Sequence, residues 1–203
     1  MKALLLAITL SSLSLSAGAV DAAYPVDRLL NDIVSIADLK CRDRGALERQ
    51  YKEQGKVAEA RSMKLAETMI CDCMPNRVKE LRASLSVSAL QEQMTETEFQ
   101  NQYGPQITNK CVAEQLRSTY GEGCADALPG RPTDSAAYCE CMYKPLSRLP
   151  DSDLAQIASE SADYVPAAAE AQRRGAPMPE QPPNLKRFFA VDAACRARQP
   201  GAG

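Results

Sequence analysis

Eight cysteines, arranged as two sets of four with matching surroundings, constrain this chain more than any other feature. The two sets are Cys41, Cys71, Cys73 and Cys111, and Cys124, Cys139, Cys141 and Cys195. In each set a single cysteine precedes a Cys-acidic-Cys-Met segment, and a last cysteine opens a Cys-x-Ala-x-Gln segment. Such repetition predicts an internal duplication, with a first four-cysteine unit at 23–120 and a second at 121–203.

The first 22 residues have the composition of a cleaved signal peptide. Lys2 supplies a positive charge, residues 4–15 form an apolar stretch diluted by serines, and Ala17-Gly18-Ala19 presents the small residues that a signal peptidase reads. The apolar stretch is shorter than the roughly 20 residues that a transmembrane helix needs. We therefore expect a signal peptide at 1–22 and a soluble mature chain that is periplasmic or secreted. No cysteine lies near the cleavage region, so we expect no lipid anchor.

Export decides how the cysteines are interpreted. Paired thiols become disulfides in an oxidising compartment, and an even number of cysteines fits complete pairing. Two residues apart on a helix, the side chains of a Cys-x-Cys pair point about 200° apart. They cannot bond to each other without strain, so each pair must cross-link two different elements to its helix. Two connectivities remain open within each set, and an exchange of partners between the sets is a further arrangement.

Apolar residues recur at helical spacing along nearly the whole chain, and no alternating strand pattern is long enough to count. We expect helices over 46–54 and 57–74, the second ended by Pro75. Ser88 is the expected cap of a short helix, and the capping box at Thr95–Glu98 starts the next one. The sequence therefore predicts an all-α protein of two tandem, disulfide-cross-linked helical units, packed together because the link between them is short.

The same pattern continues in the second unit with different loops. A helix is expected to start at Asp151, and Pro166 is expected to open a separate turn or two that ends near Gly175. Residues 176–183 are rich in proline and predict an extended segment. Asn184 is the expected cap of the last helix.

Two sulfur chemistries compete with disulfide formation. The Cys-x-Cys-Met segments offer thiolates together with the thioethers of Met74 and Met142, a donor set that suits Cu(I). Complete disulfide pairing and a core position for both methionines explain the same residues, and we favour that interpretation. Thiol exchange is less favoured, because catalytic dithiols are usually Cys-x-x-Cys pairs at a helix N-terminus. We expect no metal and no cofactor.

Catalysis has little support from the sequence. The chain has no histidine, so it lacks the commonest general base. The carboxylate pairs Glu96–Glu98 and Asp151–Asp153 lie at expected helix starts, where capping and the helix dipole explain them. There is no glycine-rich phosphate loop, and the net charge of −2 provides no field that attracts nucleic acid. We expect no enzymatic activity and no nucleic-acid partner.

Two stretches are candidate partner surfaces. Charges of both signs alternate over 42–67, which is typical of a solvated helix face. From 173 onward, six basic residues stand against two acidic ones, beside the proline-rich segment and two adjacent phenylalanines. The partner-binding candidates there are Arg173, Arg174, Lys186, Arg187 and Phe189. One phenylalanine is expected in the core and the other, Phe189, at the surface as an anchor.

These features lead to one functional hypothesis and one alternative. The chain is expected to be an exported, non-enzymatic, disulfide-rich helical protein that binds a protein partner in the cell envelope, as an inhibitor, immunity or accessory protein does. The alternative is a soft-metal (copper) or thiol-redox protein that uses the Cys-x-Cys-Met pairs. The sequence leaves the identity of the partner and the oligomeric state open.

Overall fold

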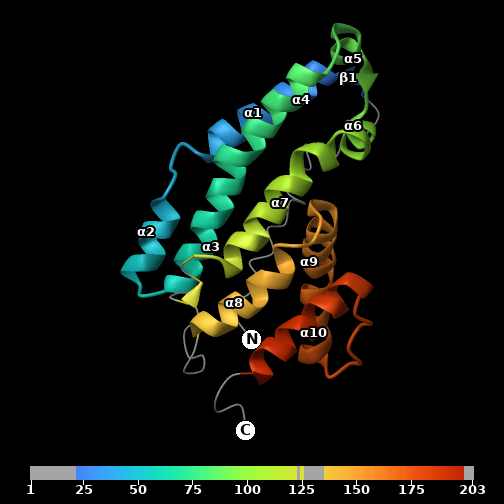
Figure 1. Cartoon of the computed structure of the whole chain (residues 1–203). Helices are drawn as coiled ribbons and strands as arrows, with labels where there is room; N and C mark the ends of the chain where they lie inside the picture. Colours follow the sequence, from blue (N-terminus) through green and yellow to red (C-terminus); the bar gives the residue numbers. More distant parts are fainter. Residues whose placement is uncertain (1–21, 123, 126–134, 199–203) are drawn as a thin grey trace.

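The computed structural model describes residues 22–122, 124–125 and 135–198, and these are almost entirely helical (Figure 1). The first part contains, in order, β1 (Tyr24–Pro25), α1 (Val26–Lys40), α2 (Ala46–Glu53), α3 (Val57–Thr68), the π-helical segment η2 (Met69–Cys73), α4 (Met74–Ser84), α5 (Val87–Gln91), β2 (Gln93–Met94), α6 (Glu96–Gln102) and α7 (Gly104–Tyr120). The second part contains α8 (Ser135–Leu146), α9 (Asp151–Arg174) and α10 (Pro183–Ala197). The predicted all-α class is confirmed. A two-residue antiparallel pairing of β1 with β2 is the single departure from it in the described ranges.

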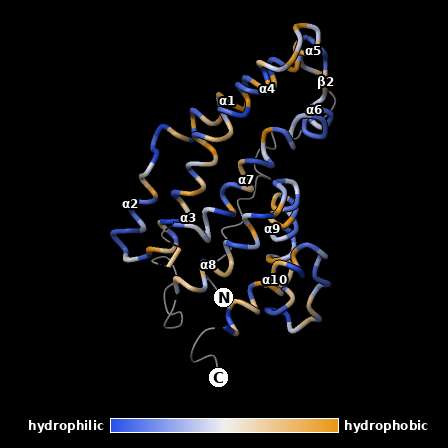
Figure 2. Tube along the Cα trace, in the orientation of Figure 1, coloured by the Kyte–Doolittle hydropathy of each residue, from blue (hydrophilic) through white to orange (hydrophobic). Residues whose placement is uncertain are grey.

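Apolar side chains gather in two core clusters, and α7 contributes to both. The first cluster is built by α1, α4, α6 and the N-terminal half of α7; its best-buried members are Val26, Leu30, Val78, Phe99 and Ile107. The second is built by the C-terminal half of α7 with α8, α9 and α10; its best-buried members are Tyr138, Met142, Leu154 and Leu185. Hydrophobic and hydrophilic residues are interspersed along the helices, as expected when each helix buries one face (Figure 2). The duplication and the unit boundary at 120/121 stay predictions.

The long helical run in the first part does not end at Pro75. Helices α3 and α4 are joined without a break by η2. The N–H of Met74 donates to the carbonyl of Met69, five residues earlier, which is the hydrogen bond of a π-helix. Pro75, which has no N–H to donate, occupies the first turn of α4. The prediction that Pro75 terminates this helix is wrong. The wider π-helical turn places Pro75 in the first turn of α4, where proline is tolerated.

The helix start predicted at Thr95 is confirmed. The Thr95 hydroxyl accepts from the Glu98 N–H at 3.2 Å, and the Glu98 carboxylate accepts from the Thr95 N–H at 2.8 Å. The hydrogen bonds from the Thr95 backbone and side chain hold the pKa of Glu98 below its usual value. The cap predicted at Ser88 is wrong. Ser86 caps α5 by accepting from the Ala89 N–H at 3.2 Å, since it is the residue with extended backbone before the first turn.

The helix predicted to begin at Asp151 does so, and it continues through Pro166 to Arg174. Gly175 ends it with φ +63°, a left-handed conformation that glycine adopts without steric cost. The predicted break at Pro166 is therefore wrong. A proline costs a helix one hydrogen bond and crowds one turn, and α9 is held by its contacts with α7 and α10. These tertiary contacts offset the local penalty.

The start of α10 is capped by another helix. Asn184, predicted to be the cap, lies inside the first turn, because α10 begins at Pro183. Glu160 of α9 instead accepts from the Leu185 N–H at 2.8 Å and from the Asn184 side-chain amide at 2.9 Å. Burial favours a higher pKa for Glu160, but the hydrogen bonds from Leu185, Asn184 and Gln156 outweigh it and hold the pKa below its usual value.

Four disulfides pair all eight cysteines, and both sets use the same order. Cys41 bonds to Cys71 and Cys73 to Cys111, while Cys124 bonds to Cys139 and Cys141 to Cys195. In each set the first cysteine of the Cys-x-Cys segment takes the preceding cysteine and the second takes the following one. The expectation that each segment cross-links two different elements is confirmed, and no bond crosses between the sets. Sequence reasoning had left this choice open.

Two predictions about export meet the structure only in part. The predicted signal peptide at 1–22 lies, except for Ala22, outside the described residues, so it stays a prediction. Among the described helices, none combines the length and the hydropathy that crossing a bilayer requires.

Candidate functional site

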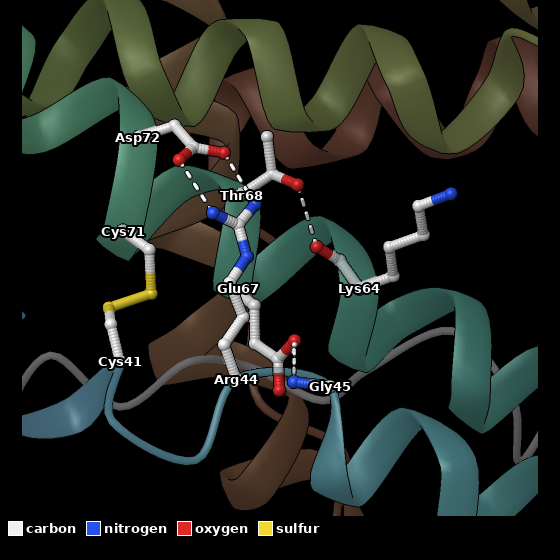
Figure 3. Close-up of a disulfide and its surroundings, with 8 residues drawn as sticks. All are labelled: Cys41, Arg44, Gly45, Lys64, Glu67, Thr68, Cys71 and Asp72. Carbon is white, nitrogen blue, oxygen red and sulfur yellow. Dashed lines mark hydrogen bonds and ion pairs between the residues drawn. A yellow bond between two sulfur atoms is a disulfide. The ribbon is translucent and has the colours of Figure 1, made fainter.

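The acidic residue of the first Cys-x-Cys segment is engaged in the structure. Figure 3 shows the disulfide between Cys41 and Cys71 beside an ion pair between Arg44 and Asp72. The Arg44 guanidinium donates to both carboxylate oxygens, at 2.7 and 2.5 Å. Its hydrogen bonds hold the pKa of Asp72 below its usual value. This segment is therefore joined to the turn after α1 by a disulfide and by an ion pair.

A carboxylate of α3 supports the same turn. Glu67 accepts a hydrogen bond from the N–H of Gly45 at 2.9 Å (Figure 3). Gly45 is the N-cap of α2 and has no side chain that could cap it. Glu67 thus acts on α2 as Glu160 acts on α10, because each supplies a capping oxygen from a neighbouring helix. The turn is a structural feature that fixes the α2–α3 hairpin.

The cysteine and methionine side chains considered as metal ligands have structural roles in the fold. All eight cysteine sulfurs are in disulfides. Met74 and Met142 are 8% and 0% exposed, and both belong to the core clusters. Within the described residues, no group of three or more histidine, cysteine or acidic side chains is arranged to hold a metal ion. Thiolate ligands would appear in this fold only after reduction of a disulfide.

The five predicted partner-binding residues lie apart from one another. Arg173 and Arg174 both pair with Glu170 on the same helix. Lys186 and Arg187 are exposed in the first turns of α10. Phe188 is buried in the second core cluster, as expected for one of the two phenylalanines.

Phe189 is not a freely exposed anchor. It is half-buried, and its ring lies 6.0 Å from that of Phe188 and 6.2 Å from that of Tyr164. These contacts give Phe189 a packing role at the edge of the second core cluster. None of the five candidates lines a cavity described below, and their role in binding stays a prediction.

A hollow of 310 Å³ lies between α8 and α10, around the disulfide of Cys141 and Cys195. We call it the basic hollow, and its lining residues are Cys141, Lys144, Pro145, Arg148, Val191, Ala194, Cys195 and Arg198. Each helix, together with the residues just beyond its C-terminal end, contributes lining residues at positions i, i+3, i+4 and i+7. The last residue of each set, Arg148 or Arg198, lies outside the helix. The disulfide joins the two sets covalently.

The lining of the basic hollow combines cations, which we call the rim, with apolar residues, which we call the floor. Among the described residues, the charged ones that line it are Lys144, Arg148 and Arg198, all exposed. In the described part of the chain, no carboxylate forms an ion pair with any of the three side chains. The floor is formed by Pro145, the disulfide and the small apolar residues of α10. Chemically, the hollow can hold an apolar group while its rim attracts anionic groups around it.

A polar network between α8 and α10 adds to the disulfide that lines the basic hollow. The hydroxyl of Tyr138 donates to Asp192, and the guanidinium of Arg196 donates to the same carboxylate at 2.7 Å. The hydrogen bond to Asp192 raises the pKa of Arg196. Together with the disulfide, these contacts hold the two helix faces in one arrangement, so the hollow is preformed.

Sequence reasoning missed the basic hollow, although part of its signal is present. Lys144 and Arg148 follow Cys141 at i+3 and i+7, and Arg198 follows Cys195 at i+3. In both cases the cations follow a cysteine at helical spacing. This spacing indicates a shared site only once Cys141 is known to bond to Cys195, and the sequence left that pairing open.

The comparisons with known proteins add nothing to these observations. No protein-family model, no curated protein and no solved structure matches the chain.

Proposed function

We propose that this protein is an exported, non-enzymatic, disulfide-rich helical protein that binds a protein partner in the cell envelope. The observation that carries the proposal is the pairing of all eight cysteines into four disulfides, each joining different parts of the helical framework. Disulfides form and persist in oxidising compartments, which favours a location outside the cytosol.

A cross-linked framework suits binding more than chemistry. Association costs free energy when side chains and loops become ordered, and a surface that is already fixed avoids part of that cost. Here the helices are fixed by the disulfides and by capping carboxylates supplied from neighbouring helices, Glu67 and Glu160. A rigid surface of this kind is typical of proteins that recognise other proteins without changing shape.

The soft-metal and thiol-redox alternative is not favoured by any observation on the described residues. Copper binding by the Cys-x-Cys-Met segments would need thiolates, and these sulfurs are bonded in pairs. It would also need the thioethers to reach the metal, whereas Met142 is fully buried in the second core cluster.

The proposal is tested by site-specific photo-crosslinking in cells that make the protein. A crosslinking amino acid is placed at one exposed position at a time: Leu47 on α2, Val87 on α5 or Ala194 on α10. The fully buried Leu154 is the negative control. We expect a discrete adduct with a second protein from at least one exposed position and none from Leu154.

Two results would contradict the proposal. The first is the absence of an adduct from every exposed position at native expression levels. The second is recovery of the protein from the cytosolic fraction with free thiols, measured by alkylating the cell extract before any reductant is added. Complete pairing predicts that no cysteine is alkylated.

A further inference from the structure

We propose that the basic hollow binds an acidic peptide segment of the partner, with one apolar side chain seated between two carboxylates. This inference rests on the proposed function and adds the chemistry of the segment that is recognised. It is carried by three features: the rim cations, none of which pairs with a carboxylate among the described residues, the apolar floor, and the size of the hollow.

The charges of the rim favour an anionic occupant. Several arginines elsewhere in the described chain are neutralised by a carboxylate, for example Arg117 by Asp151 at 2.7 Å and Arg196 by Asp192 at 2.7 Å. The three rim cations, Lys144, Arg148 and Arg198, form no such pair with any described residue. Glu140, one turn before Lys144 on α8, forms none with them either. Three like charges around one hollow repel one another, and an incoming carboxylate relieves that repulsion.

Cations near helix C-termini also have a local role. Arg148 and Arg198 each lie just beyond the end of their helix, where the helix dipole stabilises a positive charge. The same role covers Lys144, which lies in the last turn of α8. It does not explain why all three cations line one hollow.

The floor and the dimensions favour a peptide over a free anion. Pro145, Val191 and Ala194 present carbon to the hollow, and a free phosphate gains nothing from such a surface. A volume of 310 Å³ is at the lower end of the range of small-molecule sites, about 300–1,000 Å³, and is suited to one side chain with its neighbours. The stretch from Cys141 in α8 to Arg148 just beyond it lines the hollow and spans about 10 Å, at about 1.5 Å per residue. An extended peptide covers that length with about three residues.

The occupant is therefore a segment of the pattern acidic–apolar–acidic. About three residues cover the length of the hollow, so when the central apolar side chain enters it, the two flanking residues lie over its edges, within reach of the long rim side chains. The rim arginines are suited to them, because a guanidinium donates to a carboxylate through two parallel N–H groups. The segment gains apolar burial and charge pairing from the same short stretch.

The binding test uses the full mature chain with its disulfides intact and three fluorescein-labelled peptides. Their central residues are Asp-Leu-Glu, Asn-Leu-Gln and Asp-Asn-Glu in an otherwise identical neutral sequence. Fluorescence anisotropy measures each dissociation constant. We expect the first peptide to bind most tightly and each of the others to bind about tenfold more weakly, because exposed ion pairs and one apolar side chain contribute modestly.

A matched pair of variants locates the site. Ala193 and Ala194 are adjacent and exposed on α10, but only Ala194 lines the basic hollow. Ala194→Glu places a carboxylate in the hollow, and Ala193→Glu makes the same change in charge and helix propensity beside it. We expect Ala194→Glu to weaken Asp-Leu-Glu binding at least about tenfold, and Ala193→Glu to change it less than about twofold.

A second matched pair separates the rim from general positive charge. One variant replaces Lys144, Arg148 and Arg198 with glutamine. The other replaces Lys40, Lys79 and Lys110, which carry equal charge outside the hollow and outside the predicted partner surfaces. We expect binding loss in the first variant alone. Denaturant unfolding of every variant shows that a lost signal comes from the surface and not from the fold.

Three outcomes would overturn the inference. Equal losses in the two triple variants would mean non-specific attraction. Equal affinity for Asp-Leu-Glu and Asp-Asn-Glu, with full competition by inorganic phosphate, would mean a simple anion site. In cells, adducts from Leu47 or Val87 but none from Ala194 would place the partner elsewhere. That last result would leave the proposed function intact, whereas no adduct from any position would remove the function itself.

Discussion

Replacing Glu160 with glutamine isolates the charge that α9 supplies to the start of α10. Glutamine keeps an oxygen that can accept from the Leu185 N–H, now 2.8 Å from the carboxylate, but it removes the negative charge. That charge acts on a helix N-terminus whose own N-cap residue, Pro182, has no capping side chain. Capping interactions contribute about 1 kcal/mol, and charge-assisted hydrogen bonds are about twice as strong as neutral ones. We expect Glu160→Gln to lower the free energy of unfolding by about 1 kcal/mol at pH 7.

The pH dependence of this loss follows from the depressed pKa. Because the folded-state pKa of Glu160 lies below its unfolded value, its contribution is fully present above the unfolded pKa, about 4.3. The contribution is lost as the pH falls through the folded pKa. The wild-type side chain takes up a proton as the pH falls, and its protonated form resembles glutamine, so the difference between the two proteins should be smaller at about pH 2 than at pH 7.

Urea unfolding followed by far-UV circular dichroism, with the disulfides intact, measures this difference at both pH values. Glu170→Gln is the matched control on the same helix, because Glu170 pairs with Arg173 and Arg174 at the exposed end of α9. We expect the control to cost less than about 0.5 kcal/mol. Equal effects of the two substitutions at pH 7, or a Glu160→Gln deficit that persists unchanged at pH 2, would refute the capping role.

Three further predictions concern the framework. Arg44→Gln should raise the pKa of Asp72 toward its usual value, because the hydrogen bonds that depress it are lost; an NMR titration that finds the same pKa in both proteins would contradict this. Leu154→Ala should lower the free energy of unfolding by about 3 kcal/mol, since Leu154 is fully buried, and an effect below about 1 kcal/mol in urea unfolding would be inconsistent with the second core cluster. Replacing Cys141 and Cys195 with alanine should cost about 4 kcal/mol for a closed loop of 54 residues, and an unchanged unfolding midpoint would show that the bond is not formed.

Much of the fold could be predicted because its signals are local. The capping box at Thr95–Glu98 and the start of α9 at Asp151 depend on side chains within one turn, and both were predicted correctly. The geometry of Cys-x-Cys pairs is equally local, because it follows from the helical repeat and the length of a disulfide. These features need no knowledge of the neighbouring helices.

The errors arose where tertiary contacts override a local penalty. Pro75 and Pro166 were expected to end helices, because proline removes a hydrogen bond and crowds the preceding turn. In the structure, the π-helical segment before Pro75 lets the helix continue past it, and the packing of α9 on α7 and α10 stabilises the helix around Pro166. Asn184 has the residue type of a cap, yet the capping oxygen comes from Glu160, 24 residues earlier in the chain. A sequence window that contains Asn184 but not Glu160 cannot reveal which residue caps α10.

The candidate site was less accessible to sequence reasoning than the fold. The basic stretch near the C-terminus was identified, but Lys144 lies 54 residues from Arg198 and appears in a different predicted helix. Their meeting depends on which cysteine bonds to Cys141. Four cysteines allow several pairings, and spacing does not rank them. The predicted anchor Phe189 packs against Tyr164 instead, a contact between two helices that periodicity does not reveal.

The position of α7 has a consequence for how the protein unfolds. Ile107 belongs to the first core cluster and Ala113 to the second, so less than two turns of one helix separate the two. Unfolding of either core cluster disrupts α7, and the other cluster packs on the same helix. The described chain should therefore melt in one cooperative transition. A C-terminal fragment produced from residue 121 onward would lack both Ala113 and Tyr120, and it should remain a partly ordered species even with its two disulfides closed.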